Sequence, residues 1–286
     1  MKIIVTGSAG QLGQSFQEVA ESFPDFGFVF ADHGELDILS DESVRQYIKH
    51  HQADCVINCA GYTAVDQAEE DPATARMVNV RGASILAQAT SEVNALMVQI
   101  STDYIFDGKA CRPYDETANT NPLSSYGRSK LDAELEVLLN AQRSVIIRTS
   151  WLYSSFGQNF VKTILKKGQE EERLRVVYDQ IGSPTYAPDL ARGVLELLPR
   201  LPSQVRGEIF NYSNEGVCSW FDMAMAIVEF AGLPCEVTPV LSSDFKQTAM
   251  RPHYSVLNKS RIKNELSTDI PYWRDSLGIC VKRLLA

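Results

Sequence analysis

The feature that most constrains the fold of this chain is a glycine-rich turn close to its N-terminus. Residues 2–6 form a short apolar run, and a helical pattern follows the turn. A buried strand, a glycine turn and a helix in this order bring backbone N–H groups close to an anion such as a pyrophosphate. We therefore expect a dinucleotide site here, with a glycine turn that binds no ligand as the alternative. Its residues are Gly7, Gly10, Gln11, Leu12 and Gly13.

Strand-like and helix-like patterns alternate along most of the chain. The expected strands cover residues 2–6, 27–31, 55–60, 96–100, 144–149, 174–178 and 208–212. This alternation predicts an α/β fold with a Rossmann-type, doubly wound parallel sheet, and residues 235–286 break it and predict a smaller C-terminal lobe. We expect a dinucleotide-binding core in 1–150, to which parts of 174–232 return, and an interleaved, mainly substrate-binding lobe in 151–286.

Composition excludes several classes of protein. With 286 residues, 44% of them apolar, the chain can bury a large core. A net charge of -9 without any Lys/Arg-rich block argues against nucleic-acid and membrane surfaces. No apolar run approaches the roughly 18 residues of a membrane span, and the N-terminus leads directly into a strand, so we expect no signal peptide. Six scattered cysteines without a C-x-x-C pair indicate free thiols in a reducing cytoplasm.

An acidic residue follows the second expected strand. Asp32 lies nineteen residues after Gly13. A carboxylate at about this distance accepts hydrogen bonds from the adenosine ribose and disfavours a 2′-phosphate, so Asp32 favours NADH over NADPH. The alternative is that Asp32-His33-Gly34 forms an ordinary turn.

A tyrosine and a lysine four residues apart, Tyr126 and Lys130, follow a long polar loop over residues 107–124. On a helix they point the same way, so the ammonium of Lys130 would lower the pKa of the Tyr126 phenol and make it a usable proton donor. Thr102 ends the strand before the loop, where open α/β sheets bind ligands, and would polarise a carbonyl oxygen. The alternatives are a surface tyrosine, a solvated lysine and a strand-end cap.

These motifs resemble the extended short-chain dehydrogenase/reductase superfamily, whose members carry T-G-x-x-G-x-x-G and Y-x-x-x-K. Within it, the chain resembles the dTDP-4-dehydrorhamnose reductase family over nearly its whole length. The matching stretches are N-C-A-G-Y-T-A-V-D-Q-A-E (58–69), S-T-D-Y-I-F-D-G (101–108), P-L-S-S-Y-G-R-S-K (122–130), R-T-S-W-L-Y (148–153), D-Q-I-G-S-P-T (179–185) and R-P-H-Y-S-V-L-N (251–258).

The resemblance implies reduction by NADH or NADPH of the 4-keto group of dTDP-4-dehydro-β-L-rhamnose, which gives dTDP-L-rhamnose. It implies that Thr102, Tyr126 and Lys130 are catalytic, with Lys130 holding the nicotinamide ribose. Besides the glycine turn, the cofactor would contact Asp37, Ile38, Ala60, Gly61, Tyr62, Asn79, Tyr126 and Lys130. The nucleotide sugar would contact Val65, Asp103, Tyr104, Trp151, Asn159 and Arg251, the last as a partner of the pyrophosphate.

The chain departs from this family at one point. Some members form a magnesium-linked dimer through glutamates, one just after the third glycine and one in the helix after G-x-P-T. Here these neighbourhoods read Gln14-Ser15 and Ala187-Pro188-Asp189. We therefore expect no required metal, while a homodimer stays compatible with the sequence.

Two other functions compete with this interpretation. The first is another nucleotide-sugar reductase, epimerase or dehydratase of the superfamily. Dehydratases place an acidic pair directly after the threonine, whereas Thr102 is followed by Asp103-Tyr104 and thus by one carboxylate only. The second is a non-catalytic regulatory subunit like that of methionine adenosyltransferase, against which the intact Thr102, Tyr126 and Lys130 set argues.

Overall fold

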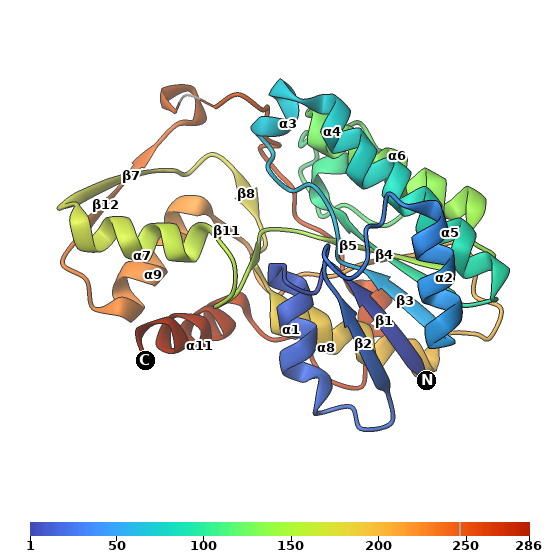
Figure 1. Cartoon of the computed structure of the whole chain (residues 1–286). Helices are drawn as coiled ribbons and strands as arrows, with labels where there is room; N and C mark the ends of the chain where they lie inside the picture. Colours follow the sequence, from blue (N-terminus) through green and yellow to red (C-terminus); the bar gives the residue numbers. More distant parts are fainter. Residues whose placement is uncertain (246) are drawn as a thin grey trace.

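A six-stranded parallel sheet forms the centre of the molecule (Figure 1). The computed structural model describes residues 1–245 and 247–286. The strand order is β10-β5-β4-β3-β1-β2, and all neighbouring strands are parallel. The strands are β1 (Lys2–Thr6), β2 (Gly27–Ala31), β3 (Cys55–Asn58), β4 (Leu96–Thr102), β5 (Arg143–Thr149) and β10 (Glu208–Asn211). The predicted doubly wound parallel sheet is confirmed.

Helices cover both faces of this sheet because successive side chains of each strand point to opposite sides. Ile3 and Val5 pack in one hydrophobic cluster with α1 and α8, whereas Ile4 packs in another with α2, α5 and α6. The helices are α1 (Gln11–Ala20), α8 (Ala187–Leu197), α2 (Asp41–His51), α5 (Gly82–Glu92) and α6 (Ser125–Asn140). The central strands β3 and β4, and β1 after Lys2, are buried on both faces, as their continuous apolar sequence predicts.

The helical segment between β3 and β4 is interrupted. The sequence predicts one long helix starting at Asp71-Pro72, and Asp71 indeed caps it by accepting a hydrogen bond from the amide of Thr74. The structure divides this segment into α4 (Pro72–Arg76), a π-helical turn η1 (Met77–Arg81) and α5, with α3 (Gln67–Glu70) before them. A π-helical turn is rare and often marks a functional site.

A second hydrophobic cluster forms a smaller lobe from the chain after β5. In it, α7 (Phe160–Glu170), α9 (Trp220–Ala231) and α11 (Trp273–Leu285) pack with β7 (Arg173–Val177), which pairs with β12 (Glu236–Val240). Of residues 174–232, α8 and β10 therefore return to the main sheet, whereas β7 and α9 belong to the lobe. The remaining elements are η2 (Asp103–Ile105), β6 (Leu152–Tyr153), β8 (Ile181–Gly182), β9 (Thr185–Tyr186), η3 (Leu198–Arg200), β11 (Cys218–Ser219), η4 (Ser242–Asp244) and α10 (Ser260–Lys263). Over 1–245 and 247–286, none of the helices combines the length and apolarity of a membrane span.

A buried ion pair fastens α6 to the sheet. The guanidinium of Arg148 in β5 donates two hydrogen bonds to the carboxylate of Glu134 in α6, at 3.0 and 2.8 Å. Their side chains are only 4% and 2% exposed. The hydroxyl of Ser101 in β4 donates to the same carboxylate, and Arg148 also donates to the backbone oxygen of Glu116. Because each charge is paired and hydrogen-bonded, these interactions offset the desolvation cost of burying the ion pair.

We expect Arg148→Ala to lower the free energy of unfolding by about 3 to 5 kcal/mol, because it leaves the Glu134 carboxylate buried and unpaired. Arg173→Ala is the matched control, since Arg173 pairs with Glu236 on the surface, where both side chains are more than half exposed. Losing such a surface pair costs about 0 to 1 kcal/mol. Urea denaturation of both variants measures the difference, and equal losses would contradict the role of the buried pair.

Candidate active site

Two adjoining cavities lie along the edge of the sheet where the strands end. The first, of about 320 Å³, is lined by the turn after β1 and by residues that follow β2. The second, of about 610 Å³, is lined by residues that follow β4 and β5 and by the start of α6. Both include Gly10, Cys59, Ala60 and Gly61, so together they form one continuous cleft. This is the edge at which open α/β sheets bind ligands.

The glycine turn has the shape of an anion cradle. Gly7 has a φ of +63°, and a Cβ added there would lie 2.7 Å from the backbone of Ala60. A Cβ at Gly13 would lie 2.4 Å from the backbone oxygen of Gly7. At the N-terminus of α1 no side chain caps the amides, and no acidic residue occupies the first turn. The turn therefore brings uncapped backbone N–H groups to the cleft, which fits the pyrophosphate of a dinucleotide.

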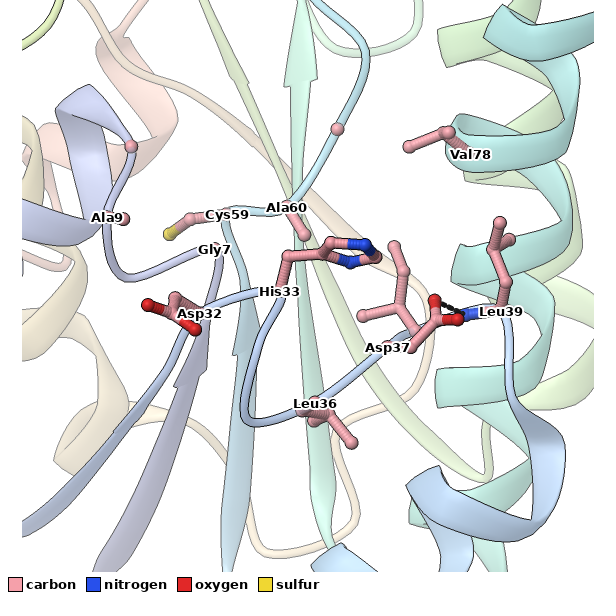
Figure 2. A pocket seen from close by; sticks show the side chains of 13 residues that line it. Gly7, Ala9, Asp32, His33, Leu36, Asp37, Leu39, Cys59, Ala60 and Val78 are labelled. Atoms are coloured by element: carbon pink, nitrogen blue, oxygen red, sulfur yellow. Dashed lines mark hydrogen bonds between the residues drawn. The ribbon is translucent and has the colours of Figure 1, made fainter.

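The first cavity contains two carboxylates (Figure 2). Asp32 accepts hydrogen bonds through Oδ1 from the amides of Gly34 and Glu35, at 2.8 and 3.2 Å. Asp37 likewise accepts from the amide of Leu39 at 2.9 Å. Asp32 thus both closes the turn and lines the cavity, so the two sequence-based interpretations of this residue are compatible. Among the described residues that line this cavity there is no Lys or Arg.

Thr102, Tyr126 and Lys130 line the second cavity together. Thr102 ends β4, and Tyr126 and Lys130 lie on the first two turns of α6. The start of α6 approaches η2 so closely that a Cβ at Gly127 would lie 2.2 Å from the backbone oxygen of Tyr104. The rings of Tyr104 and Tyr126 meet edge to face, 5.6 Å apart. Gly127 therefore permits the contact that puts the phenol of Tyr126 next to the strand end.

Burial shifts the pKa values of Tyr126 and Lys130 in the directions that favour their neutral forms. Desolvation raises the pKa of Tyr126 to about 12, although a hydrogen bond with Thr102 opposes the shift. Desolvation lowers the pKa of Lys130 to about 8, against the charge of Glu134. The ammonium of Lys130 donates to the backbone oxygen of Ile100 at 2.6 Å. The prediction that Lys130 lowers the pKa of Tyr126 is wrong for this structure, because desolvation of the phenol is the largest effect on it.

Asp103 is a buried carboxyl group at the same cavity. Its Oδ1 accepts a hydrogen bond from Thr102 at 3.1 Å, and its Oδ2 is buried without a hydrogen-bond partner. Burial raises its pKa from 3.8 to about 6, against hydrogen bonds from Ser255 and Thr102. A carboxyl group with an unused oxygen in a cavity has the chemistry to bind a hydroxyl group.

The other residues predicted to face the nucleotide sugar divide into two groups. Val65, Tyr104, Trp151 and Asn159 line the second cavity. Arg251 lines a different, shallower cavity instead. Its guanidinium donates to both carboxylate oxygens of Asp66, at 3.1 and 2.6 Å. The structure therefore joins Arg251 to the loop after β3, and a hydrogen bond with Tyr104 puts it next to the cavity that holds Tyr126.

Two residues predicted to contact the cofactor, Tyr62 and Asn79, line neither cavity of the cleft. The side chain of Asn79 accepts from the amide of Tyr62 and donates to its backbone oxygen, at 2.8 and 3.1 Å. It also donates to the hydroxyl of Ser129 at 2.9 Å. Asn79 thus ties the loop after β3 to α6. Gly13 also lines no cavity, but it packs beneath the turn.

Sequence reasoning missed several residues that shape the cleft. Glu134 lies four residues after Lys130 and so shares its helix face, a spacing that could have drawn attention to it. Gly127 sits inside the Tyr126 to Lys130 motif, where a helical glycine is itself unusual. Trp220 and His33 also line the cavities, but no local pattern marks them.

The comparison with known proteins decides the family. The family model described as "RmlD substrate binding domain" matches residues 1–286. The chain belongs to this family. The match confirms the resemblance that the sequence motifs carry.

Relatives of this RmlD-family chain cover its whole length. It is 36% identical to a dTDP-4-dehydrorhamnose reductase of Burkholderia thailandensis, over 100% of both chains. It is 39% identical to the spore coat polysaccharide biosynthesis protein SpsK of Bacillus subtilis, over 96% of this chain and 95% of the relative. The crystal structure of the Bacillus anthracis dTDP-4-dehydrorhamnose reductase in complex with NADP is 37% identical, with a TM-score of 0.92 over 99% of both chains.

We expect Asp103→Asn to stabilise the protein near neutral pH. Because the folded pKa of Asp103, about 6, lies above its ordinary value of 3.8, its contribution to stability is complete below the ordinary pKa and is lost as pH rises through the folded pKa. The free energy of unfolding of the variant, relative to that of the wild type, should therefore rise by about 2 to 3 kcal/mol as the pH increases from about 4 to 7. Denaturation across this range measures the difference, and a constant difference would contradict the raised pKa.

Proposed function

We propose that this protein is an NAD(P)H-dependent oxidoreductase that reduces the 4-keto group of dTDP-4-dehydro-β-L-rhamnose to give dTDP-L-rhamnose. The observation that carries the proposal is that Thr102, Tyr126 and Lys130 line one cavity beside the glycine turn. The family match and the relatives named dTDP-4-dehydrorhamnose reductase support the substrate. The NADP complex of the Bacillus anthracis relative supports a nicotinamide cofactor.

The residues that line the first cavity and the glycine turn suit a dinucleotide cofactor. Gly7 and Gly10 would hold the pyrophosphate, and Asp32, Asp37, Ile38, Ala60 and Gly61 would hold the adenosine half in the first cavity. When bound, the reduced nicotinamide supplies a hydride. Lys130 keeps donors beyond the one directed to Ile100 and would hold a ribose hydroxyl with them.

Tyr126 acts as the proton donor to the substrate oxygen. Its raised pKa, about 12, keeps the phenol protonated at neutral pH, so the proton is in place when a carbonyl is reduced. Thr102 donates a hydrogen bond to the same oxygen and stabilises the charge that develops on it. Asp103 and Trp151 line the cavity beside this pair and would contact the sugar.

The competing functions fit the cavity less well. A dehydratase needs both an acid and a base for water loss, and Asp103 is the only carboxylate among the described residues that line the second cavity. A regulatory subunit has no need of a threonine, a tyrosine and a lysine gathered at one strand edge. Carbonyl reduction uses each of these three groups.

Four further features stay predictions. Residues 1–150, with parts of 174–232, would mainly bind the cofactor and the interleaved lobe in 151–286 the sugar nucleotide, which the separate hydrophobic cluster of the lobe supports. A cytoplasmic location is supported by the six free cysteines. Independence from a metal and formation of a homodimer rest on the sequence alone.

The deciding experiment supplies the 4-keto sugar nucleotide, made in place by the upstream enzymes, and follows loss of reduced-cofactor absorbance. We expect oxidation of NADH or NADPH by the wild type. Tyr126→Phe should lose at least about a hundredfold in kcat, because general acid catalysis contributes at least that much, while its cofactor Kd stays unchanged. No oxidation by the wild type with either cofactor would refute the reductase, and full activity of the variant would remove Tyr126 as the acid.

The cofactor preference follows from the carboxylates of the first cavity. We expect Asp32→Ala to improve the use of NADPH relative to NADH, because it removes a negative charge near the ribose 2′-position. Asp25→Ala is the control, since Asp25 precedes β2 and lines neither cavity of the cleft. The ratio of kcat/KM for the two cofactors measures the effect, and an unaltered ratio would place Asp32 away from the ribose.

A further inference from the structure

Two tryptophans stack face to face at the second cavity. The rings of Trp151 and Trp220 lie 3.6 Å apart between centroids, with planes only 6° apart. Both line the same cavity as Tyr126 and Lys130. Trp151 follows β5 of the main sheet, whereas Trp220 is the first residue of α9 in the lobe. The stack therefore joins the two sides of the cavity.

The backbone of Trp151 adopts an uncommon conformation. Its φ of +47° lies in the left-handed region, which bulky residues rarely occupy without support from their surroundings. The amide of Thr185 donates to the backbone oxygen of Trp151 at 3.1 Å. The indole lies so close to Gly182 that a Cβ there would be 2.5 Å from the ring. Gly182 and Trp220 thus hold the indole in one orientation.

Trp220 is itself fixed in place. Its Nε1 donates to Oε1 of Gln180 at 3.2 Å, and the ring of Phe160 lies 4.6 Å away. A capping box between Ser219 and Asp222 fixes the start of α9 directly beside it. Because Gln180, Phe160 and the capped helix start fix Trp220, its ring can in turn fix the position of the Trp151 indole.

The stack lies at the reacting end of the cleft. Thr149, two residues before Trp151, is the register partner of Thr102 across β4 and β5. The backbone oxygen of Leu152, the next residue, accepts a hydrogen bond from Gln11 of the glycine turn at 3.1 Å. The indole pair therefore begins between Thr102 and the cofactor turn, which favours contact with the sugar over contact with the nucleotide base.

We propose that Trp220 is a positioning residue for the sugar: together with Gly182 it holds the indole of Trp151 between them, so that the indole edge forms a rigid wall of the sugar site. This inference rests on the proposed function for the identity of the sugar. A deoxyhexose presents C–H groups and a methyl group, and the fixed edge of the indole offers these groups apolar contact at little cost in side-chain entropy. Trp220 acts through Trp151, so its removal should loosen the sugar more than it affects the chemical step.

Trp220→Ala and Trp220→Phe test the role, with Met225→Ala on an exposed position of α9 as the control. Near-UV circular dichroism reports the stack, whose coupled indoles should give a signal that both Trp220 variants lose. We expect Trp220→Ala to raise KM for the sugar nucleotide about three- to tenfold, the range expected from losing one aromatic pair, with a smaller change in kcat. Trp220→Phe should recover part of this loss.

Calorimetric titrations separate the possible causes. We expect Trp220→Ala to weaken binding of dTDP-L-rhamnose, while its Kd for dTDP and for the cofactor stays within about twofold of the wild type. Equal weakening for dTDP would place the stack at the base, and an unchanged KM after loss of the dichroism signal would make the stack purely structural; either result overturns the proposal. If the wild type oxidises no cofactor, the proposed function fails, whereas binding of dTDP-L-rhamnose still tests the stack.

Discussion

The geometry of the cleft depends on the hydrogen bonds that the buried carboxylate of Glu134 accepts. This carboxylate accepts hydrogen bonds from Arg148 in β5 and from Ser101 in β4, directly before Thr102. Glu134 also lies one turn after Lys130 on α6. One buried group thus sets the position of the helix that carries the proposed acid relative to the strand that carries Thr102. A charge buried this deeply is rarely retained without such partners.

Burial decides the electrostatics of the site. It raises the pKa of Asp103 and of Tyr126 and lowers that of Lys130, and in each case the neutral form gains. A phenol that keeps its proton suits reduction, in which the acid starts protonated. The sequence predicts the acid through its spacing to a cation, but desolvation is the largest effect on the phenol and raises its pKa. The role of Tyr126 therefore rests on its position and its proton more than on a lowered pKa.

The local patterns of the sequence predict the sheet and the residues at its strand ends. Gly7, Thr102 and Tyr126 lie where strand ends and helix starts put them, because these positions follow from the chain order of a parallel sheet. Contacts between segments that are distant in the sequence cannot be predicted from local patterns. No local pattern near Arg251 indicates that it pairs with Asp66. Likewise, the sequence of β7 does not distinguish it from a strand of the main sheet, although it pairs with β12 in the lobe. Both outcomes depend on how the lobe packs.

Two departures from regular structure lie at or beside the cleft. Trp151 holds a left-handed backbone beside the proposed sugar site, and the π-helical turn Met77–Arg81 aims Asn79 at Tyr62 and Ser129. By contrast, Gln52, another residue with positive φ, caps the C-terminus of α2, where this conformation is common. Strained positions persist only where their surroundings hold them, so the place of Trp151 in the cavity of Tyr126 argues that its backbone conformation serves the site.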